Sequence, residues 1–282
     1  MSTYTLPNGL AIQHANAHET AHLYTDIFQE RLYVANGIGL PQDAIVFDVG
    51  ANIGLFTLFV VQNYPSASVF AVEPAPRTFE LLTANTSRYG RVSRYNCGAG
   101  ASAGTLTFTY FPNLTCGSGY YDSAEIARIE SVHRSMILAD PKKREAFSGP
   151  VGEELLSYYL DRTLRRETVN TPVRPLSALI DESGVNRIDL LKIDAEGCES
   201  QVLAGIREDQ WSSIRQLVVE VHDSKKSLAG ITSVLSSRGY WVHAAPQKPP
   251  DFVGKAMVYA KFGESPSNER NVMDSDSSKY EM

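Results

Sequence analysis

Apolar positions along the chain follow two alternating patterns. Unbroken apolar runs, of which residues 45–49 are the clearest, are typical of strands buried on both faces of a parallel sheet. Stretches with a helical period, such as residues 77–89, separate these runs. Strands are predicted at 45–49, 68–73, 92–97, 188–194 and 216–222, and helices at 55–61, 77–89, 176–182, 199–206 and 228–238. This alternation predicts a Rossmann-like α/β fold with a mostly parallel sheet and its ligand at the carboxyl ends of the strands.

Less regular segments frame this pattern at both ends. Residues 1–43 precede the first buried strand and are expected to cap a single domain that spans residues 44–262. The last two strands are expected to form an antiparallel hairpin at one edge of the sheet. The polar residues 263–282 are expected to be disordered. The strands and helix of these segments are predicted at 9–13, 22–33, 240–244 and 256–262.

A long interruption separates the two halves of the α/β pattern. Residues 112–172 follow an alternating strand at 105–111 and carry polar helical stretches, near 123–138 and 152–166. Insertions of this length are commonly lids or binding elements. We expect a lid over the substrate; a rigid contact within a homodimer is the alternative. Two adjacent aromatic residues, Tyr120 and Tyr121, are expected either to line a substrate pocket or to form the core of the lid.

Charge and composition narrow the classes of partner. The 282 residues carry a formal net charge of −6, which disfavours nucleic acid and anionic membrane as partners because both attract clustered Lys and Arg. The first residues show no basic and apolar leader, and no run approaches the roughly 20 apolar residues of a membrane helix. Three cysteines without CxxC spacing predict neither a disulfide framework nor a cysteine zinc site. A cytoplasmic protein with a small-molecule substrate is therefore expected.

The first chemical motif is Asp48-Val49-Gly50-Ala51-Asn52-Ile53-Gly54, where a buried strand passes through a glycine turn into a helix. Glycine lets the backbone approach a ligand, and the start of a helix offers free N–H groups. The spacing is not the G-x-G-x-x-G of dinucleotide folds. The carboxylate of Asp48 would repel a pyrophosphate but attract the amino and sulfonium groups of S-adenosylmethionine. We predict that Asp48, Gly50, Asn52 and Gly54 bind this cofactor; a tight turn without a ligand is the alternative.

Two further strand ends complete the predicted cofactor site. Glu73 ends the second strand of the sheet, where an acid can accept both hydrogen bonds of a ribose diol. A surface acid before a proline turn is the alternative. Asn96 and Cys97 end the third strand, and the small residues after them would let the backbone contact an adenine. A plain glycine-rich turn is the alternative there.

The later strands carry acids and a histidine at their carboxyl ends. Methyl transfer from a sulfonium is an in-line displacement, and a hydroxyl nucleophile needs its proton removed. Asp194, Glu196 and His222 are the predicted catalytic residues, although Glu196 could simply cap the next helix and His222 could simply end its strand. With Glu220 they form a set of carboxylate and imidazole groups that could hold Mg²⁺. Spacing does not establish such an ion, and no metal is predicted.

Several of these segments resemble the FkbM family of methyltransferases. The run Lys192-Ile193-Asp194-Ala195-Glu196-Gly197 carries most of the resemblance, and the glycine turn, Ala71-Val72-Glu73-Pro74 and Val218-Val219-Glu220-Val221-His222 support it. The resemblance covers about residues 30–111 and 173–222, while residues 112–172 depart from the common family pattern. It implies a class I methyltransferase fold and methylation of oxygen in sugars and other natural products.

These observations predict an S-adenosylmethionine-dependent O-methyltransferase acting on a small natural product or a sugar-bearing intermediate. Two other functions stay open. Methylation of nitrogen or of a carboxylate could depend more on positioning and less on a base. A non-catalytic nucleotide-binding or scaffolding protein could retain the same fold.

Overall fold

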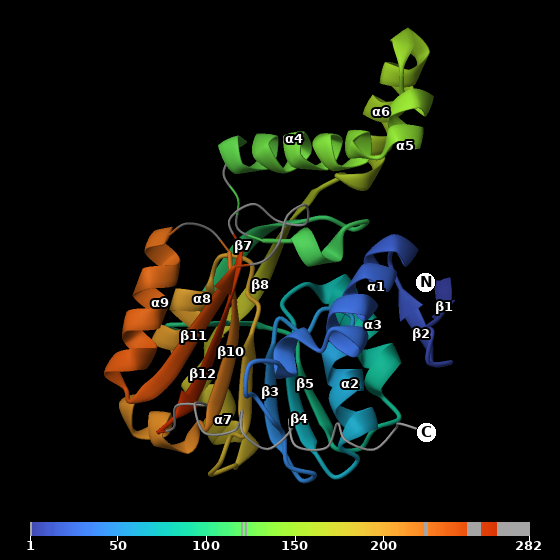
Figure 1. The fold of residues 1–282 in the computed structure, drawn as a ribbon. Helices are drawn as coiled ribbons and strands as arrows, with labels where there is room; N and C mark the ends of the chain where they lie inside the picture. The colour runs from blue at the N-terminus through green and yellow to red at the C-terminus, as the bar shows by residue number, and fades with distance from the viewer. Residues whose placement is uncertain (1, 120, 122, 223–224, 247–254, 264–282) are drawn as a thin grey trace, which may run out of the picture.

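The computed structural model describes residues 2–119, 121, 123–222, 225–246 and 255–263. Its centre is a seven-stranded sheet with the order β11-β12-β10-β9-β3-β4-β5 (Figure 1). The strands are β3 (Ile45–Val49), β4 (Ser68–Val72), β5 (Val92–Tyr95), β9 (Leu190–Ile193), β10 (Gln216–Val221), β11 (Tyr240–Pro246) and β12 (Ala256–Phe262). Neighbours from β10 to β5 pair in parallel, whereas β12 pairs antiparallel with both β10 and β11. The predicted Rossmann-like α/β fold with an antiparallel edge hairpin is confirmed.

Alternate side chains of the buried strands pack into two cores on opposite faces of the sheet. In β3, Val46 belongs to the first core and Phe47 to the second. The first core includes α2 (Leu55–Asn63) and α3 (Pro76–Thr86). The second core includes α7 (Leu176–Ser183), α8 (Glu199–Ala204) and α9 (Lys225–Ser237). Since both faces are covered, the parallel strands expose mainly their carboxyl ends, where a ligand can reach them.

The N-terminal segment folds as a small sheet followed by a broken helix. β1 (Ser2–Thr5), which the sequence analysis missed, pairs with β2 (Ala11–His14). The single helix predicted at 22–33 is wrong in its extent, because α1 (Ala17–Tyr24) begins earlier, where the Asn16 side chain accepts the N–H groups of His18 and Glu19. A π-helical turn (Thr25–Gln29) and a 3-10 turn (Leu32–Val34) continue the chain. The two turns meet at Arg31, whose φ of 55° interrupts the helix.

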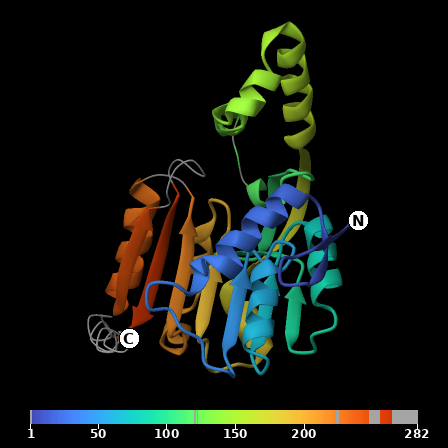
Figure 2. The same ribbon diagram turned by 45° about the vertical axis from the view of Figure 1, so that its right-hand side comes forward.

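The predicted insertion is only partly helical. Its last residues belong to β8 (Glu167–Pro175), which pairs antiparallel with β7 (Gly104–Tyr110) and parallel with β6 (Gly98–Gly100) in a second, three-stranded sheet. Between β7 and β8 lie a 3-10 turn (Thr115–Gly117), α4 (Ser123–Ala139), α5 (Pro141–Ala146) and α6 (Gly149–Thr163). Figures 1 and 2 both show the three helices standing away from the main sheet, on the side where its site lies.

The remaining described residues add one 3-10 turn, Glu208–Ser213, before β10. Within the described ranges, no helix is both long enough and apolar enough to cross a membrane. Tyr120 and the tail beyond residue 263 were the subject of sequence predictions, but they lie outside the described residues.

Candidate active site

The glycine turn after β3 is shaped by protein packing. Gly50 has a φ of +75°, and a Cβ atom there would lie 1.7 Å from the backbone oxygen of Asp194. Gly54 has a φ of +91°, and a Cβ atom there would lie 2.8 Å from Leu82 Cδ1. Both glycines are thus required by packing within the protein, and the prediction that they also bind a cofactor stays a prediction. Gly50 lets the turn pass the end of β9, and Gly54 lets α2 pack closely on α3.

Asp48 lies beneath this turn and not in a cavity. Its side chain is fully buried; Oδ2 accepts a hydrogen bond of 2.7 Å from Thr57, and Oδ1 lies 3.1 Å from Lys192 Nζ. β3 and β9 place Asp48 and Lys192 side by side in register. Lys192 Nζ also donates to the Gly50 carbonyl over 2.7 Å. The predicted direct contact of Asp48 with a cationic cofactor is thus corrected. Lys192 forms an ion pair with this carboxylate and links it to the turn through its hydrogen bond to Gly50.

Glu73 lines a cavity at the carboxyl ends of β3, β4 and β9. Its carboxylate accepts the backbone N–H of Asn52 at Oε2 and that of Ala75 at Oε1, each over 2.9 Å. Burial raises the pKa of Glu73 to about 7, against these two hydrogen bonds that lower it. Asn52, held at a φ of 50°, lines the same cavity. Both predicted cofactor residues therefore reach the cavity, although Asn52 does so as the backbone partner of Glu73.

The two residues that follow β5, Asn96 and Cys97, do not contact the cavity as predicted. The exposed Asn96 side chain donates to the backbone oxygen of Glu73, and Cys97 is buried within the second core. Neither residue lines the cavity, whereas the next two, Gly98 and Ala99, do. Asn96 and Cys97 are thus corrected to supporting positions, because the strand turns at Cys97 into β6 and presents the following backbone.

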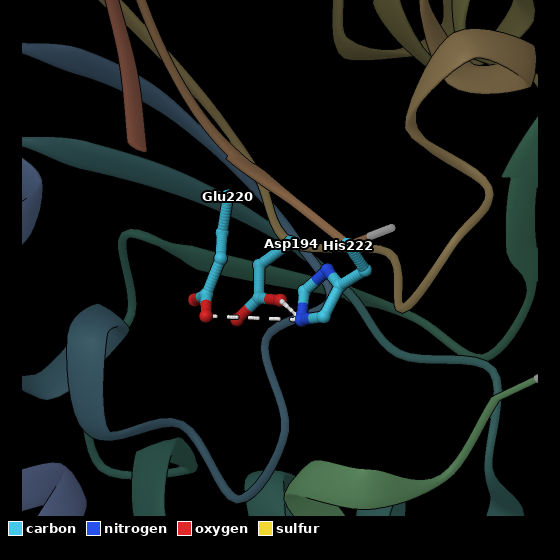
Figure 3. A group of neighbouring side chains, drawn as sticks. All are labelled: Asp194, Glu220 and His222. Atoms are coloured by element: carbon cyan, nitrogen blue, oxygen red, sulfur yellow. Dashed lines mark ion pairs between the residues drawn. The ribbon is translucent and has the colours of Figure 1, made fainter. Parts of the chain in front are cut away.

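Four side chains gather where β9 and β10 end: Asp194, Glu196, Glu220 and His222, which we call the strand-end cluster. His222 Nε2 lies 3.2 Å from Glu196 Oε2, 3.7 Å from Asp194 Oδ1 and 3.7 Å from Glu220 Oε1. Figure 3 shows Asp194, Glu220 and His222 directed toward one another. The three predicted catalytic residues therefore lie together, and Glu220 joins them.

Groups from distant parts of the chain hold the cluster in place. Tyr33, in the 3-10 turn of the N-terminal segment, donates to Asp194 Oδ2 or Glu220 Oε2, which lie 3.1 and 3.2 Å from its hydroxyl. The Glu199 carboxylate lies 2.9 Å from His222 Nδ1. Lys255 Nζ lies 3.2 Å from Glu220 Oε1 and 3.8 Å from Glu196 Oε1.

Burial and close charges set the protonation of the cluster. Burial, followed by the charge of Glu220, raises the pKa of Asp194 to about 6. Burial also disfavours the charged form of Glu220, but Lys255 and His222 lower the pKa of this carboxyl to about 2. For His222 the loss of water is outweighed by Glu196 and Glu199, which raise the pKa of the imidazole well above its usual range. The cluster thus combines an excess of carboxylates with two cationic groups, His222 and Lys255, which balance part of the negative charge.

A second cavity, of about 410 Å³, opens on the other side of the cluster. Its walls come from α1, the Thr115–Gly117 turn, α4 and α6, and include the apolar Leu114, Ile129, Val132 and Met136. Glu196 and Cys116 line both cavities, while Asp194 lines only the first and His222 only the second. The two cavities therefore meet at the strand-end cluster.

The wall between the cavities depends on Glu19 of α1, which the sequence analysis did not single out. Its carboxylate accepts the N–H and the hydroxyl of Thr115 and the N–H of Cys116. Glu19 is 8% exposed, and an acid so well buried needs these partners. Tyr33, Lys255 and Glu199 were missed as well. Of these, only Glu199 carried a local signal, because it follows the acidic run that begins at Asp194.

Comparison with known proteins identifies the family. The methyltransferase FkbM domain model matches residues 48–242. The 31-O-demethyl-FK506 methyltransferase FkbM of Streptomyces tacrolimicus is 37% identical over 90% of this chain and 94% of its own, and methyltransferase sdnD of Sordaria araneosa is 34% identical over 79% and 82%. A crystal structure of a methyltransferase FkbM from Methylobacillus flagellatus KT gives a TM-score of 0.49 at 16% identity, over 80% of this chain and 46% of that chain. The chain belongs to the FkbM family of methyltransferases.

Proposed function

We propose that this methyltransferase uses S-adenosylmethionine to methylate a hydroxyl group of a small, largely apolar natural product or sugar-bearing intermediate. The observation that carries the proposal is the meeting of two cavities at the strand-end cluster. A methyl donor in the first cavity and an acceptor in the second would face each other there. Such an arrangement supports an in-line displacement, because the two reactants are held on opposite sides of the transferred group.

The first cavity offers groups that suit the donor. Glu73 can accept the hydrogen bonds of a ribose diol, since each carboxylate oxygen has a second lone pair beside its bond to the backbone. The backbone at Gly98 and Ala99 is available to a base. The carboxylates of Asp194 and Glu196 line the opposite end and would attract the cationic sulfonium and amino groups. The role first given to Asp48 passes in this proposal to Asp194.

The second cavity offers groups that suit a neutral acceptor. Its volume of about 410 Å³ lies within the range of small-molecule sites, and α4 lines it with Ile129, Val132 and Met136 beside polar side chains of the same helix. Its inner end is formed by Glu196 and His222. We infer that the acceptor hydroxyl lies against these side chains and that the Glu196 carboxylate takes its proton as the hydroxyl oxygen attacks the methyl carbon, while His222, whose pKa is raised, stays protonated and holds Glu196 in place. The C–S bond then breaks, leaving a methyl ether and S-adenosylhomocysteine.

Oxygen is the favoured acceptor atom for two reasons. The strand-end cluster would repel an acceptor carboxylate, because three carboxylates already lie within it. A relative that is 37% identical is named as a methyltransferase of 31-O-demethyl-FK506, which supports methyl transfer to oxygen here as well. Nitrogen remains the second acceptor to be tested.

The decisive experiment combines the purified chain, ¹³C-methyl-labelled S-adenosylmethionine and an extract of apolar hydroxylated metabolites. Mass spectrometry should find a product heavier by one labelled methyl group. The carbon shift of that group distinguishes an ether from an amine, and mild alkaline hydrolysis releases it only from an ester. A labelled amine or ester would refute O-methylation. Binding of the cofactor without any labelled product would favour a non-catalytic role.

A further inference from the structure

Within the described residues, the strand-end cluster contains two buried polar atoms without a hydrogen-bond partner, Asp194 Oδ1 and His222 Nε2. Their nearest charged neighbours are each other, 3.7 Å apart, and Glu196 Oε2, which lies 3.2 Å from Nε2. His222 is 9% exposed, and its Nε2 points toward the carboxylates of Asp194 and Glu220 (Figure 3). Buried polar atoms are rarely left in this state, so a group that binds here is expected.

A carboxylate fixes the imidazole in a form that can bind a cation. Glu199 is 2% exposed and lies 2.9 Å from His222 Nδ1, while it also accepts the backbone N–H of Gly197. With Nδ1–H directed at a carboxylate, Nε2 is the ring nitrogen that would bind a cation, and the cation would replace the contact of Nε2 with Glu196 Oε2, which lies 3.2 Å away. This carboxylate–histidine pairing is the usual support of a metal-binding histidine, because it sets both the tautomer and the orientation of the ring.

The distances and charges also fit a cation. One ligand atom each from Asp194, Glu220 and His222 lie within 4.8 Å of one another. Adjacent and opposite ligands of an octahedral Mg²⁺ lie about 3 and 4.2 Å apart, so small side-chain rotations would bring these three atoms to three of its six positions. Tyr33 already holds Asp194 and Glu220 together from the far side. The cluster has three carboxylates. Of the two nearby lysines, Lys192 is paired with Asp48, and Lys255 lies 3.2 Å from Glu220 Oε1 and balances part of the negative charge.

We propose that Asp194, Glu220 and His222 bind one divalent cation of the Mg²⁺ and Mn²⁺ class. Two carboxylate oxygens suit both ions, and the imidazole nitrogen favours Mn²⁺. Asp194 lines the first cavity and His222 the second, so a cation held between them would lie where the two cavities meet. If the proposed function is correct, an acceptor hydroxyl in the second cavity would bind this cation, and the cation would make its proton easier to remove. Only this last step rests on the proposed function.

The test uses the full chain, stripped with a chelator and titrated with Mn²⁺ under electron paramagnetic resonance. The signal of free Mn²⁺ should disappear until one ion per chain is bound. Pulsed measurements should detect a directly bound ¹⁴N nucleus, and this coupling should vanish in His222→Gln. Asp194→Asn and Glu220→Gln should each weaken Mn²⁺ binding at least tenfold. The positioning variant Glu199→Gln should weaken it about 10- to 100-fold, the effect typical of losing a histidine's supporting carboxylate.

Glu196→Gln is the matched control, because it removes one charge from the same cluster without removing one of the three ligands. It should weaken Mn²⁺ binding less than Asp194→Asn does. Thermal unfolding without metal checks that each variant is folded. Unchanged affinity in Asp194→Asn and Glu220→Gln, or no saturable Mn²⁺ site, overturns the inference. Full turnover after chelation would overturn the part of the cation in proton removal while leaving the proposed function intact. A bound Mn²⁺ without any methylated product would support the cation site and count against the proposed function.

Discussion

Replacing Glu73 by Gln should weaken S-adenosylmethionine binding and also change its pH dependence. The substitution keeps the volume of the side chain but removes the charge that would accept the ribose hydrogen bonds. Hydrogen bonds to charged groups are worth about 1.5–3 kcal/mol. At pH 8 the dissociation constant should therefore rise about 10- to 150-fold. The carboxylate lies in the cavity with both oxygens fixed by the backbone, so little reorganisation should compensate.

The pH dependence follows from the raised pKa of Glu73, about 7. Only the carboxylate can accept both ribose bonds, and its fraction rises from about one tenth at pH 6 to about nine tenths at pH 8, so cofactor affinity should rise about tenfold. The amino group of the cofactor also titrates near pH 8, so the effect of Glu73 is the difference between the wild-type and Glu73→Gln curves. Calorimetry at several pH values measures both curves.

The stability of the folded chain should respond to pH in the opposite direction from cofactor affinity, and should fall as the pH rises. Because the pKa of Glu73 is about 7 in the folded chain and 4.5 ordinarily, the folded state retains this proton to higher pH than the unfolded state. The free energy of unfolding should therefore fall by about 3 kcal/mol as pH rises from 4.5 to 7, and Glu73→Gln should remove this fall. At low pH the variant should be less stable, since one backbone N–H loses its acceptor at a cost of about 1–3 kcal/mol.

The exposed Glu80 on α3 supplies the control, because Glu80→Gln makes the same change of charge outside the cavity. It should leave cofactor affinity and both pH profiles unaltered. The reasoning is refuted if Glu73→Gln binds S-adenosylmethionine as tightly as the wild-type chain at pH 8, or if the two curves stay parallel between pH 6 and 8.

Three further predictions concern the turn, the buried ion pair and the insertion. Gly50→Ala should lower the melting temperature of the cofactor-free chain well below that of Gly184→Ala, which shares the positive φ but has open space at its Cβ; similar losses would contradict the packing role. Asp48→Asn should cost about 3–5 kcal/mol in chemical denaturation by leaving a buried lysine unpaired, whereas Asp43→Asn at an exposed pair should change little. Replacing residues 123–163 by a flexible linker should preserve cofactor binding but abolish turnover, because these residues line only the second cavity; an active variant that merely dissociates from a dimer would favour the contact role.

The main sheet could be predicted because each of its parallel strands has a recognisable apolar run in its own sequence. β9 and β10 are buried along their whole length, so their sequences are mainly apolar, with Lys192 inside β9 and acids at or next to the carboxyl end of each strand. The second small sheet was not predictable in the same way. β8 alternates between exposed and half-buried positions over most of its length, and its polar residues resemble the insertion that precedes them. Its pairing with β7 is a long-range contact that no local pattern encodes.

The glycine turn shows that a sequence motif can be located correctly while one of the reasons for it is missed. A turn at the end of a strand favours glycine with a positive φ when a neighbour passes close to its backbone. That neighbour can be another part of the protein or a ligand. At Gly50 the neighbour is the carbonyl of Asp194. The contact still serves the site, because it brings the turn after β3 against the end of β9. The sequence motif therefore marks the junction of two strands, and the cavity forms beside that junction.

The strand-end cluster, too, could be predicted from the sequence only in part. Asp194 and His222 could be predicted, since each ends a strand whose carboxyl end faces the site. Their partners could not, because Tyr33 comes from a 3-10 turn and Lys255 precedes an antiparallel strand. In the unfolded chain these groups are solvated separately. Folding gathers Tyr33, Glu199 and Lys255 around the cluster, so its orientation and its protonation arise from tertiary packing. Variants of these three residues should therefore alter the pH profile and the cation affinity of the site even though the sequence motif stays intact.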